Sequence, residues 1–237
     1  MTSKNYRPCI AFKLNYCDGG KNFEHVGFCG ICSDAIIKYN IKIKNRRWCS
    51  HEDCACRKYF DKKISRDELE ENFEDEIGGN FPCYESATLR DWMCTAGSDE
   101  YNGNRKIRGA KTGHLCLLTT VEPNMPESSR MVVAMFIIGK IFEGNEDESG
   151  FVCANDNFDY CLEFSPNEAR KMKFWEIYQN PNAADTIKWG SGLFRYFSDE
   201  DAVKFLEMAV EAKLGTDDET FAKDFLKHYC ETNNLSM

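Results

Sequence analysis

The cysteines of this 237-residue chain are concentrated near its start, where nine of thirteen occur in the first 94 residues. Cys29-Gly-Ile-Cys32 is a C-x-x-C turn, and Cys49, Cys54 and Cys56 follow closely. Two thiolates one tight turn apart can hold a single ion at about 2.3 Å. We therefore expect a metal centre with the following candidate ligands: Cys29, Cys32, Cys49, Cys54, Cys56 and Cys83.

Zinc is the first expectation for this centre, because clustered thiolates are its usual structural ligands. A 4Fe-4S cluster is the alternative, since Cys32, Cys49, Cys56 and Cys83 offer four widely spaced thiolates. Unliganded cysteines are the third interpretation. A thioredoxin-like redox pair at Cys29 and Cys32 is less favoured, because no clear βαβ pattern surrounds it. The later cysteines lie in apolar or helical contexts and are interpreted as structural.

The charge distribution also separates the front of the chain from the rest. Residues 1–64 carry 13 Lys and Arg against 6 Asp and Glu, whereas residues 65–237 carry 17 against 33. Cations alternate with aromatic rings from Lys38 to Lys63, a composition that suits phosphate neutralisation and base stacking. The candidate nucleic-acid contacts here are Lys44, Arg46, Arg47, Arg57 and Lys58. A solvated face that offsets the charge of nearby thiolates is an equally simple interpretation.

Local signals divide the chain into three parts. A strand is predicted over Pro8–Tyr16, and Ser65-Arg-Asp-Glu68 is a capping box that opens a helix to about Glu76. Gly78-Gly79 then marks a boundary. We expect a cysteine-rich basic metal-binding module over residues 1–80, a β core over 81–164 and a helical part over 165–237.

The β core and the helical part have clear element signals. His114–Val121 and Met131–Ile138 read as strands, and Gly139 indicates a bulge or sharp bend after the second. Ser165-Pro-Asn-Glu168 combines a capping serine, a first-turn proline and a reciprocal glutamate, which predicts a helix to about Gln179. Two further capped helices are predicted over residues 198–214 and 216–232. The fold class is therefore α+β.

The motif Lys111-Thr-Gly-His-Leu115, the strand that follows it and the Val133–Phe142 segment with Gly139 resemble the PUA-like superfamily, which includes EVE, ASCH and YTH domains. The resemblance covers residues 84–164, about a third of the chain. It implies a small β-barrel with a pocket for a nucleotide base, often a modified one.

In such a fold, Trp92, Trp189 and Arg195 are candidate nucleic-acid contacts. Trp189-Gly-Ser-Gly192 is a glycine-rich segment, which we expect to leave the indole ring accessible.

Catalysis has weaker support in the sequence. The chain shows no P-loop, nucleophile elbow, dinucleotide fingerprint or H-E-x-x-H motif. Some ASCH proteins are amidohydrolases with a Lys, Thr and Glu set, and the resemblance offers Lys111, Thr119 and Glu85 as counterparts. Whether the protein is an enzyme stays open.

The sequence lacks an apolar run long enough to cross a membrane and lacks a secretory signal, so we expect a cytoplasmic protein without a membrane partner. The expected function is binding of DNA or RNA, with recognition of a modified base through a PUA-like pocket. The first alternative is a nuclease or a nucleobase- or nucleoside-modifying hydrolase, with or without an iron-sulfur cluster. A protein-interaction scaffold folded around its metal is the second.

Overall fold

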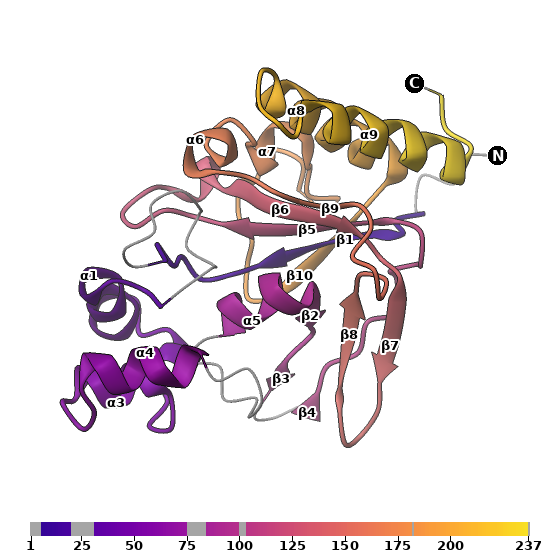
Figure 1. Cartoon of the computed structure of the whole chain (residues 1–237). Coiled ribbons are helices and arrows are strands. Elements are labelled where there is room, and N and C mark those ends of the chain that lie inside the picture. Colours follow the sequence, from indigo (N-terminus) through magenta and orange to yellow (C-terminus); the bar gives the residue numbers. More distant parts are fainter. Residues whose placement is uncertain (1–5, 20–30, 75–83, 100–102, 182, 237) are drawn as a thin grey trace. The chain divides into compact units, whose positions relative to one another are not determined.

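The computed structural model describes residues 6–19, 31–74, 84–99, 103–181 and 183–236 (Figure 1). The chain forms two compact units. Unit 1 falls within residues 1–14, 92–121 and 125–237, and unit 2 within residues 15–91 and 122–124. Each unit is described separately below.

Unit 1 is built on a five-stranded sheet in which most strand residues are buried. The strand order is β10-β1-β5-β6-β9, and the parallel pair β1 and β5 is flanked by antiparallel neighbours. All six residues of β5 are buried, which agrees with a central strand covered on both faces. The strands are β1 (Cys9–Lys13), β5 (Leu115–Thr120), β6 (Met131–Ile137), β9 (Cys161–Glu163) and β10 (Phe194–Phe197).

A second, three-stranded antiparallel sheet of unit 1 has the order β2-β8-β7. Trp92 packs edge-to-face against Phe136 of β6, with ring centroids 6.0 Å apart. Gly139 lies where the chain leaves β6 of the five-stranded sheet for β7 of the three-stranded one, and a Cβ atom there would lie 2.4 Å from the backbone nitrogen of Asn155, so only glycine fits. The remaining strands are β2 (Met93–Thr95), β3 (Ser98–Asp99), β4 (Gly103–Asn104), β7 (Lys140–Gly144) and β8 (Ser149–Cys153).

The two long helices of unit 1, α8 (Asp199–Lys213) and α9 (Glu219–Asn233), lie side by side over one face of the five-stranded sheet (Figure 1). Both confirm the sequence prediction. Ser198 caps α8 by accepting a hydrogen bond from the backbone nitrogen of Asp201.

The helix predicted to run from residue 165 to 179 is wrong beyond its first turn. The capping box of Ser165 and Glu168 is present, but α6 (Pro166–Ala169) ends early and α7 (Phe174–Ile177) is separate. The intervening backbone bonds to the chain around β6 instead, because Val132 N–H donates to the Met172 carbonyl and Phe174 N–H donates to the Arg130 carbonyl. Tertiary hydrogen bonds therefore override the local helical pattern.

Unit 2 is helical in the residues that the structure describes. Its capping box is formed as predicted, since the Ser65 N–H donates to Glu68 Oε2 at 2.6 Å and the Glu68 N–H donates to Ser65 Oγ at 3.1 Å. The elements of unit 2 are α1 (Asp34–Lys38), the π-helix η1 (Tyr39–Ile43), α2 (Arg47–Ser50), α3 (Ala55–Phe60), α4 (Arg66–Glu74) and α5 (Tyr84–Asp91). The short 3-10 helix η2 (Glu127–Ser129) belongs to unit 1.

The α+β class and the helical C-terminal part are confirmed. The described strands form open sheets and close no barrel, so the PUA-like barrel stays a prediction. Among the described residues, the helices are too short or too polar to cross a bilayer.

Candidate metal centre and nucleic-acid interface

Two cysteines and an aspartate of unit 2 bring three potential metal ligands together. The sulfurs of Cys17 and Cys32 and a carboxylate oxygen of Asp18 all lie within 4.8 Å of one another. Cys17 is 1 % exposed and Cys32 is 6 % exposed, so both thiols are shielded from bulk water. Cys32 was expected to be a ligand from its C-x-x-C turn, whereas Cys17 and Asp18 follow the predicted Pro8–Tyr16 strand and were not predicted as ligands.

Hydrogen bonds between the neighbours of the two cysteines explain why they meet. Asp18 follows Cys17 and Ser33 follows Cys32. The Ser33 N–H donates to Asp18 Oδ1 at 2.8 Å, and the Ser33 hydroxyl donates to Asp18 Oδ2 at 2.5 Å. Ser33 is also the N-cap of α1. This double contact fixes the two chain segments side by side and orients the carboxylate, as residues behind metal ligands commonly do.

The donor set fits a thiophilic divalent ion. Two buried thiols and one carboxylate match zinc, which binds sulfur, nitrogen and oxygen donors in tetrahedral sites. Iron-sulfur clusters are held mainly by thiolates, so a carboxylate beside the sulfurs favours zinc. The structure therefore supports a candidate metal centre, with the ion type undetermined.

The other predicted cysteine ligands are placed as follows. Cys54 and Cys56 flank the start of α3, and Cys49 lies in α2. A hydrogen bond from the Cys56 side chain, helped by the backbone N–H groups of Arg57 and Cys56, lowers the pKa of the Cys54 thiol to about 6. In the described part of unit 2, these three sulfurs join no group of three potential ligands within 4.8 Å. Cys29 and Cys83 lie outside the described residues.

Cations of unit 2 lie over aromatic rings along the segment from η1 to α3. Lys42 Nζ is 5.4 Å from the Phe60 ring centroid, and Lys44 Nζ is 5.6 Å from that of Tyr39. The Arg47 guanidinium lies 5.7 Å from the Trp48 ring, which is 49 % exposed. Rings and positive groups are thus presented together, as in surfaces that bind single-stranded nucleic acid.

A cavity of about 560 Å³ opens beside this segment of unit 2, within the usual size range of small-ligand sites. Its rings are Tyr59 and Phe60. The Tyr59 hydroxyl donates to Asp34 Oδ1 at 3.1 Å, which fixes one wall. The full lining is Asp34, Ile37, Lys38, Tyr59, Phe60, Lys62, Lys63, Ile64, Ser65 and Glu68.

The remaining cations predicted in this region differ in their surroundings. Arg57 is held by Asp61, with Nε 2.7 Å from Oδ2, and also donates to the Ser50 carbonyl at 3.3 Å. Arg46 is half-buried, and its Nε lacks a hydrogen-bond partner among the described residues. Lys58 is half-buried in α3. Lys44 and Arg47 are exposed, which makes them the more accessible contacts.

The aromatic contacts predicted in unit 1 are buried. The expectation of an accessible Trp189 ring is wrong, since this side chain is 2 % exposed. The guanidinium groups of Arg130 and Arg195 lie over its ring, 4.6 Å and 5.7 Å from the centroid, and its Nε1 donates to the Gly192 carbonyl at 2.9 Å. Trp92 is 9 % exposed. These rings serve the packing of unit 1 in this structure.

The residues offered by the ASCH resemblance do not form a described catalytic set. Thr119 is buried in β5, and its hydroxyl donates to the Phe12 carbonyl at 2.8 Å. Lys111 is exposed in unit 1. Glu85 belongs to unit 2, where burial raises the pKa of its carboxyl group and Oε1 accepts a hydrogen bond from the Asn15 N–H at 3.1 Å.

No protein-family model matches the chain, and comparisons with curated proteins and with solved structures also gave no match. Fold and site therefore define the protein only as an α+β protein with a cysteine-rich unit that contains a basic segment, residues 38–63.

Proposed function

We propose that this protein binds single-stranded nucleic acid through unit 2, using the surface between Lys38 and Lys63 that we call the basic aromatic surface. The observation that supports this proposal is the set of three cation-ring pairs, Lys42 with Phe60, Lys44 with Tyr39 and Arg47 with Trp48. In these pairs a phosphate-binding group and a stacking platform stand next to each other. Unpaired bases with accessible faces match that arrangement better than a closed duplex does.

Charge supports the same proposal. The segment 38–63 contains nine Lys and Arg residues against three Asp and Glu residues, in a chain whose overall charge is -9. A positive surface on an acidic protein attracts polyanions locally while the rest of the molecule repels them. The cavity lined by Tyr59 and Phe60 is large enough to hold one base of a nucleic-acid strand that binds to the basic aromatic surface.

In this proposal the metal centre has a structural role. An ion bound by Cys17 and Cys32 would join the loop that contains Cys17 to the residues directly before α1, and η1 follows α1 directly. Zinc is the favoured ion because of the mixed sulfur and oxygen donors. The PUA-like relationship of residues 84–164, with its pocket for a modified base, stays part of the hypothesis, but the carrying observation lies in unit 2.

Neutralising two exposed cations of the basic aromatic surface should weaken nucleic-acid binding in a salt-dependent way. The variant Lys44→Gln/Arg47→Gln removes two phosphate-binding groups. Each phosphate contact on a single strand contributes about 0.7 to the slope of log affinity against log salt, so the slope should fall by about 1.4. Fluorescence anisotropy of labelled single-stranded DNA and RNA over a salt series measures this.

The matched control is Lys106→Gln/Lys171→Gln, which removes the same charge from exposed positions of unit 1. Its slope and affinity should stay near the unsubstituted values. Equal losses in both variants would reduce the effect to net charge, and no loss in either would remove nucleic acid from the proposal. Stronger binding to duplex than to single strands would contradict the stacking argument.

Trp48→Ala should weaken binding of single strands by about 5- to 150-fold, because stacking of one base on an aromatic ring contributes about 1–3 kcal/mol. The Trp48 ring is half-exposed, whereas Trp92 and Trp189 are buried, so ligand quenching of tryptophan fluorescence should also fall in this variant. Phe158→Ala is the control, since Phe158 is a 48 % exposed ring of unit 1. An unchanged affinity in Trp48→Ala would show that bases do not stack there.

A further inference from the structure

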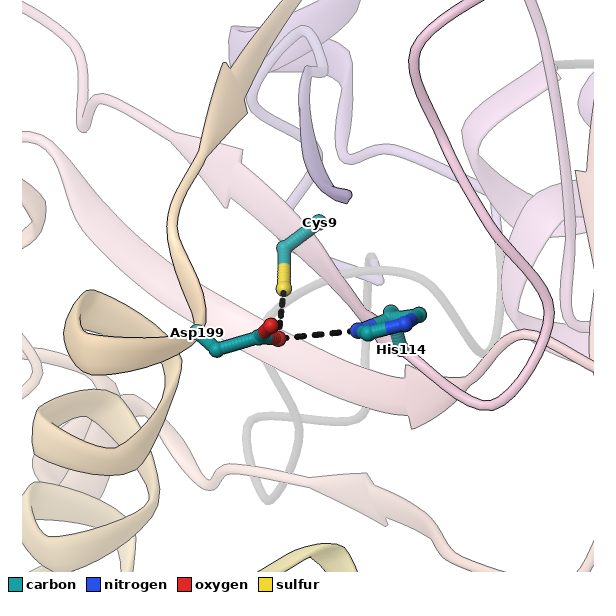
Figure 2. A group of neighbouring side chains, drawn as sticks. All are labelled: Cys9, His114 and Asp199. Atoms are coloured by element: carbon teal, nitrogen blue, oxygen red, sulfur yellow. Dashed lines mark hydrogen bonds and ion pairs between the residues drawn. The ribbon is translucent and has the colours of Figure 1, made fainter. Parts of the chain in front are cut away.

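The described part of unit 1 contains a second group of potential ligands, none of which belongs to unit 2. Cys9 begins β1, His114 directly precedes β5 and Asp199 is the first residue of α8. One ligand atom from each lies within 4.8 Å of the other two. Figure 2 shows the three side chains pointing toward one another from three separate segments.

The strand pairing and the N-terminal cap of α8 bring these three side chains together. β1 and β5 are parallel neighbours, with Ile10 opposite Cys116. The N-terminal ends of both strands therefore lie next to each other. β10 pairs with the other side of β1, with Phe197 opposite Cys9, and Ser198 then caps α8. Asp199 is thereby delivered next to Cys9, although the two are separated by 190 positions in the sequence.

The carboxylate of Asp199 is the centre of the group. Its Oδ1 lies 3.5 Å from Cys9 Sγ and 2.8 Å from His114 Nδ1. The Tyr229 hydroxyl donates to the same oxygen at 2.6 Å and lies 3.1 Å from Cys9 Sγ. Cys9 is fully buried, whereas the side chains of His114 and Asp199 are 12 % and 13 % exposed. The Cys9 thiol is therefore shielded from water, whereas His114 and Asp199 keep a small exposed surface.

The spacing suits a tetrahedral ion. Bonds of about 2.3 Å to sulfur and about 2.0–2.2 Å to nitrogen and oxygen place neighbouring ligand atoms about 3.3–3.6 Å apart. The distance from Cys9 Sγ to Asp199 Oδ1 already falls in this range. His114 Nδ1 and Asp199 Oδ1 would have to separate by about half an ångström, which a side-chain rotation supplies.

Charge also agrees with a divalent ion. One thiolate and one carboxylate neutralise a +2 ion, so the ion brings no net charge into a mostly buried place. A sulfur, nitrogen and oxygen donor set is characteristic of zinc-type ions and unsuited to Mg²⁺ or Ca²⁺, which take oxygen ligands.

We propose that Cys9, His114 and Asp199 bind one thiophilic divalent transition-metal ion of the zinc type. The Cys9 thiol proton leaves to solvent on binding, and neutral His114 binds through Nδ1 with its proton on Nε2. Tyr229 supports the bound carboxylate by its hydrogen bond. Three protein ligands leave a fourth position for water or a small ligand, the arrangement found in reactive zinc sites. None of its residues belongs to the metal centre of unit 2 or to the basic aromatic surface.

The test is metal stoichiometry in the full chain without an affinity tag, loaded with Zn²⁺ or Co²⁺ and freed of excess ion. His114→Gln and Asp199→Asn should each bind one equivalent less than the unsubstituted protein. His228→Gln is the matched control, because His228 is a histidine of unit 1 that stacks on Tyr160 at 4.0 Å and belongs to no described ligand group. His114→Cys should restore the lost equivalent, since cysteine can replace histidine as a zinc ligand.

The Co²⁺ difference spectrum between the unsubstituted protein and His114→Gln identifies the ligands. It should contain tetrahedral ligand-field bands and a thiolate charge-transfer band from Cys9. Equal stoichiometry in all variants would overturn the proposal, and so would a difference spectrum without the thiolate band. Cooperative thermal unfolding of His114→Gln, followed by near-UV circular dichroism, shows that a loss of metal does not come from a loss of folding.

Discussion

Serine at Cys17 or Cys32 should abolish metal binding by unit 2 and unfold the helices around it. Both thiols are buried and share the Asp18 carboxylate, so removal of either sulfur breaks the candidate centre. Structural zinc supplies about 10–16 kcal/mol of apparent binding free energy in zinc-finger peptides, and that energy contributes directly to folding. Metal analysis combined with hydrogen exchange of α1 and α3 amides measures both effects.

Cys153→Ser is the control for this substitution, because Cys153 is a half-buried cysteine of unit 1 that belongs to no described ligand group. It should keep its metal content and exchange pattern. A Cys32→Ser protein that keeps both properties would show that the unit 2 cysteines only fill its core. If protein prepared without oxygen is brown and contains iron, the centre holds an iron-sulfur cluster and not zinc.

Alanine at Lys213 should destabilise unit 1 by about 3–5 kcal/mol, since it leaves a partner charge buried without compensation. Lys213 Nζ donates to Glu168 Oε2 at 3.0 Å and to Asp218 Oδ2 at 2.9 Å. The Lys213 side chain is 5 % exposed and that of Glu168 is 11 % exposed. Urea unfolding, followed by the fluorescence of Trp175 and Trp189, reports on this unit.

A double-mutant cycle separates the lost charge from the lost packing. Lys213→Met/Glu168→Gln removes both charges but keeps an oxygen that can accept the Ser165 N–H of the capping box. It should cost clearly less than the sum of the single substitutions. Lys223→Ala is the exposed comparison, because Lys223 pairs with Glu219 at the surface and should change stability by less than about 1 kcal/mol. Similar losses for Lys213→Ala and Lys223→Ala would contradict the argument.

The sequence predicted those elements whose signals are local. The caps at Ser65, Ser165 and Ser198 mark real helix starts, and the apolar runs around Leu117 and Ala134 are buried strands. The helix predicted to residue 179 was interrupted by hydrogen bonds to the chain around β6, which no local pattern contains.

The sites were harder to predict, because they depend on contacts between distant residues. Trp189 was expected to be accessible from its glycine neighbours, yet Arg130, 59 positions earlier, covers one side of its ring. Cys17 was missed as a candidate ligand, although the Cys17-Asp18 pair before Gly19 was an available signal. Cys9 gave no signal, since its neighbours His114 and Asp199 are brought to it only by sheet pairing.

The pairing of β1 has a consequence for synthesis on the ribosome. β1 is followed by the whole of residues 15–91 before its partners β5 and β10 are made, and Cys9 pairs opposite Phe197. Because translation proceeds from the N-terminus, residues 15–91, which are all of unit 2 except residues 122–124, are made while β1 still lacks both neighbours. Most of unit 2 can therefore fold during translation, whereas the sheet of unit 1 must wait until Phe197 has emerged.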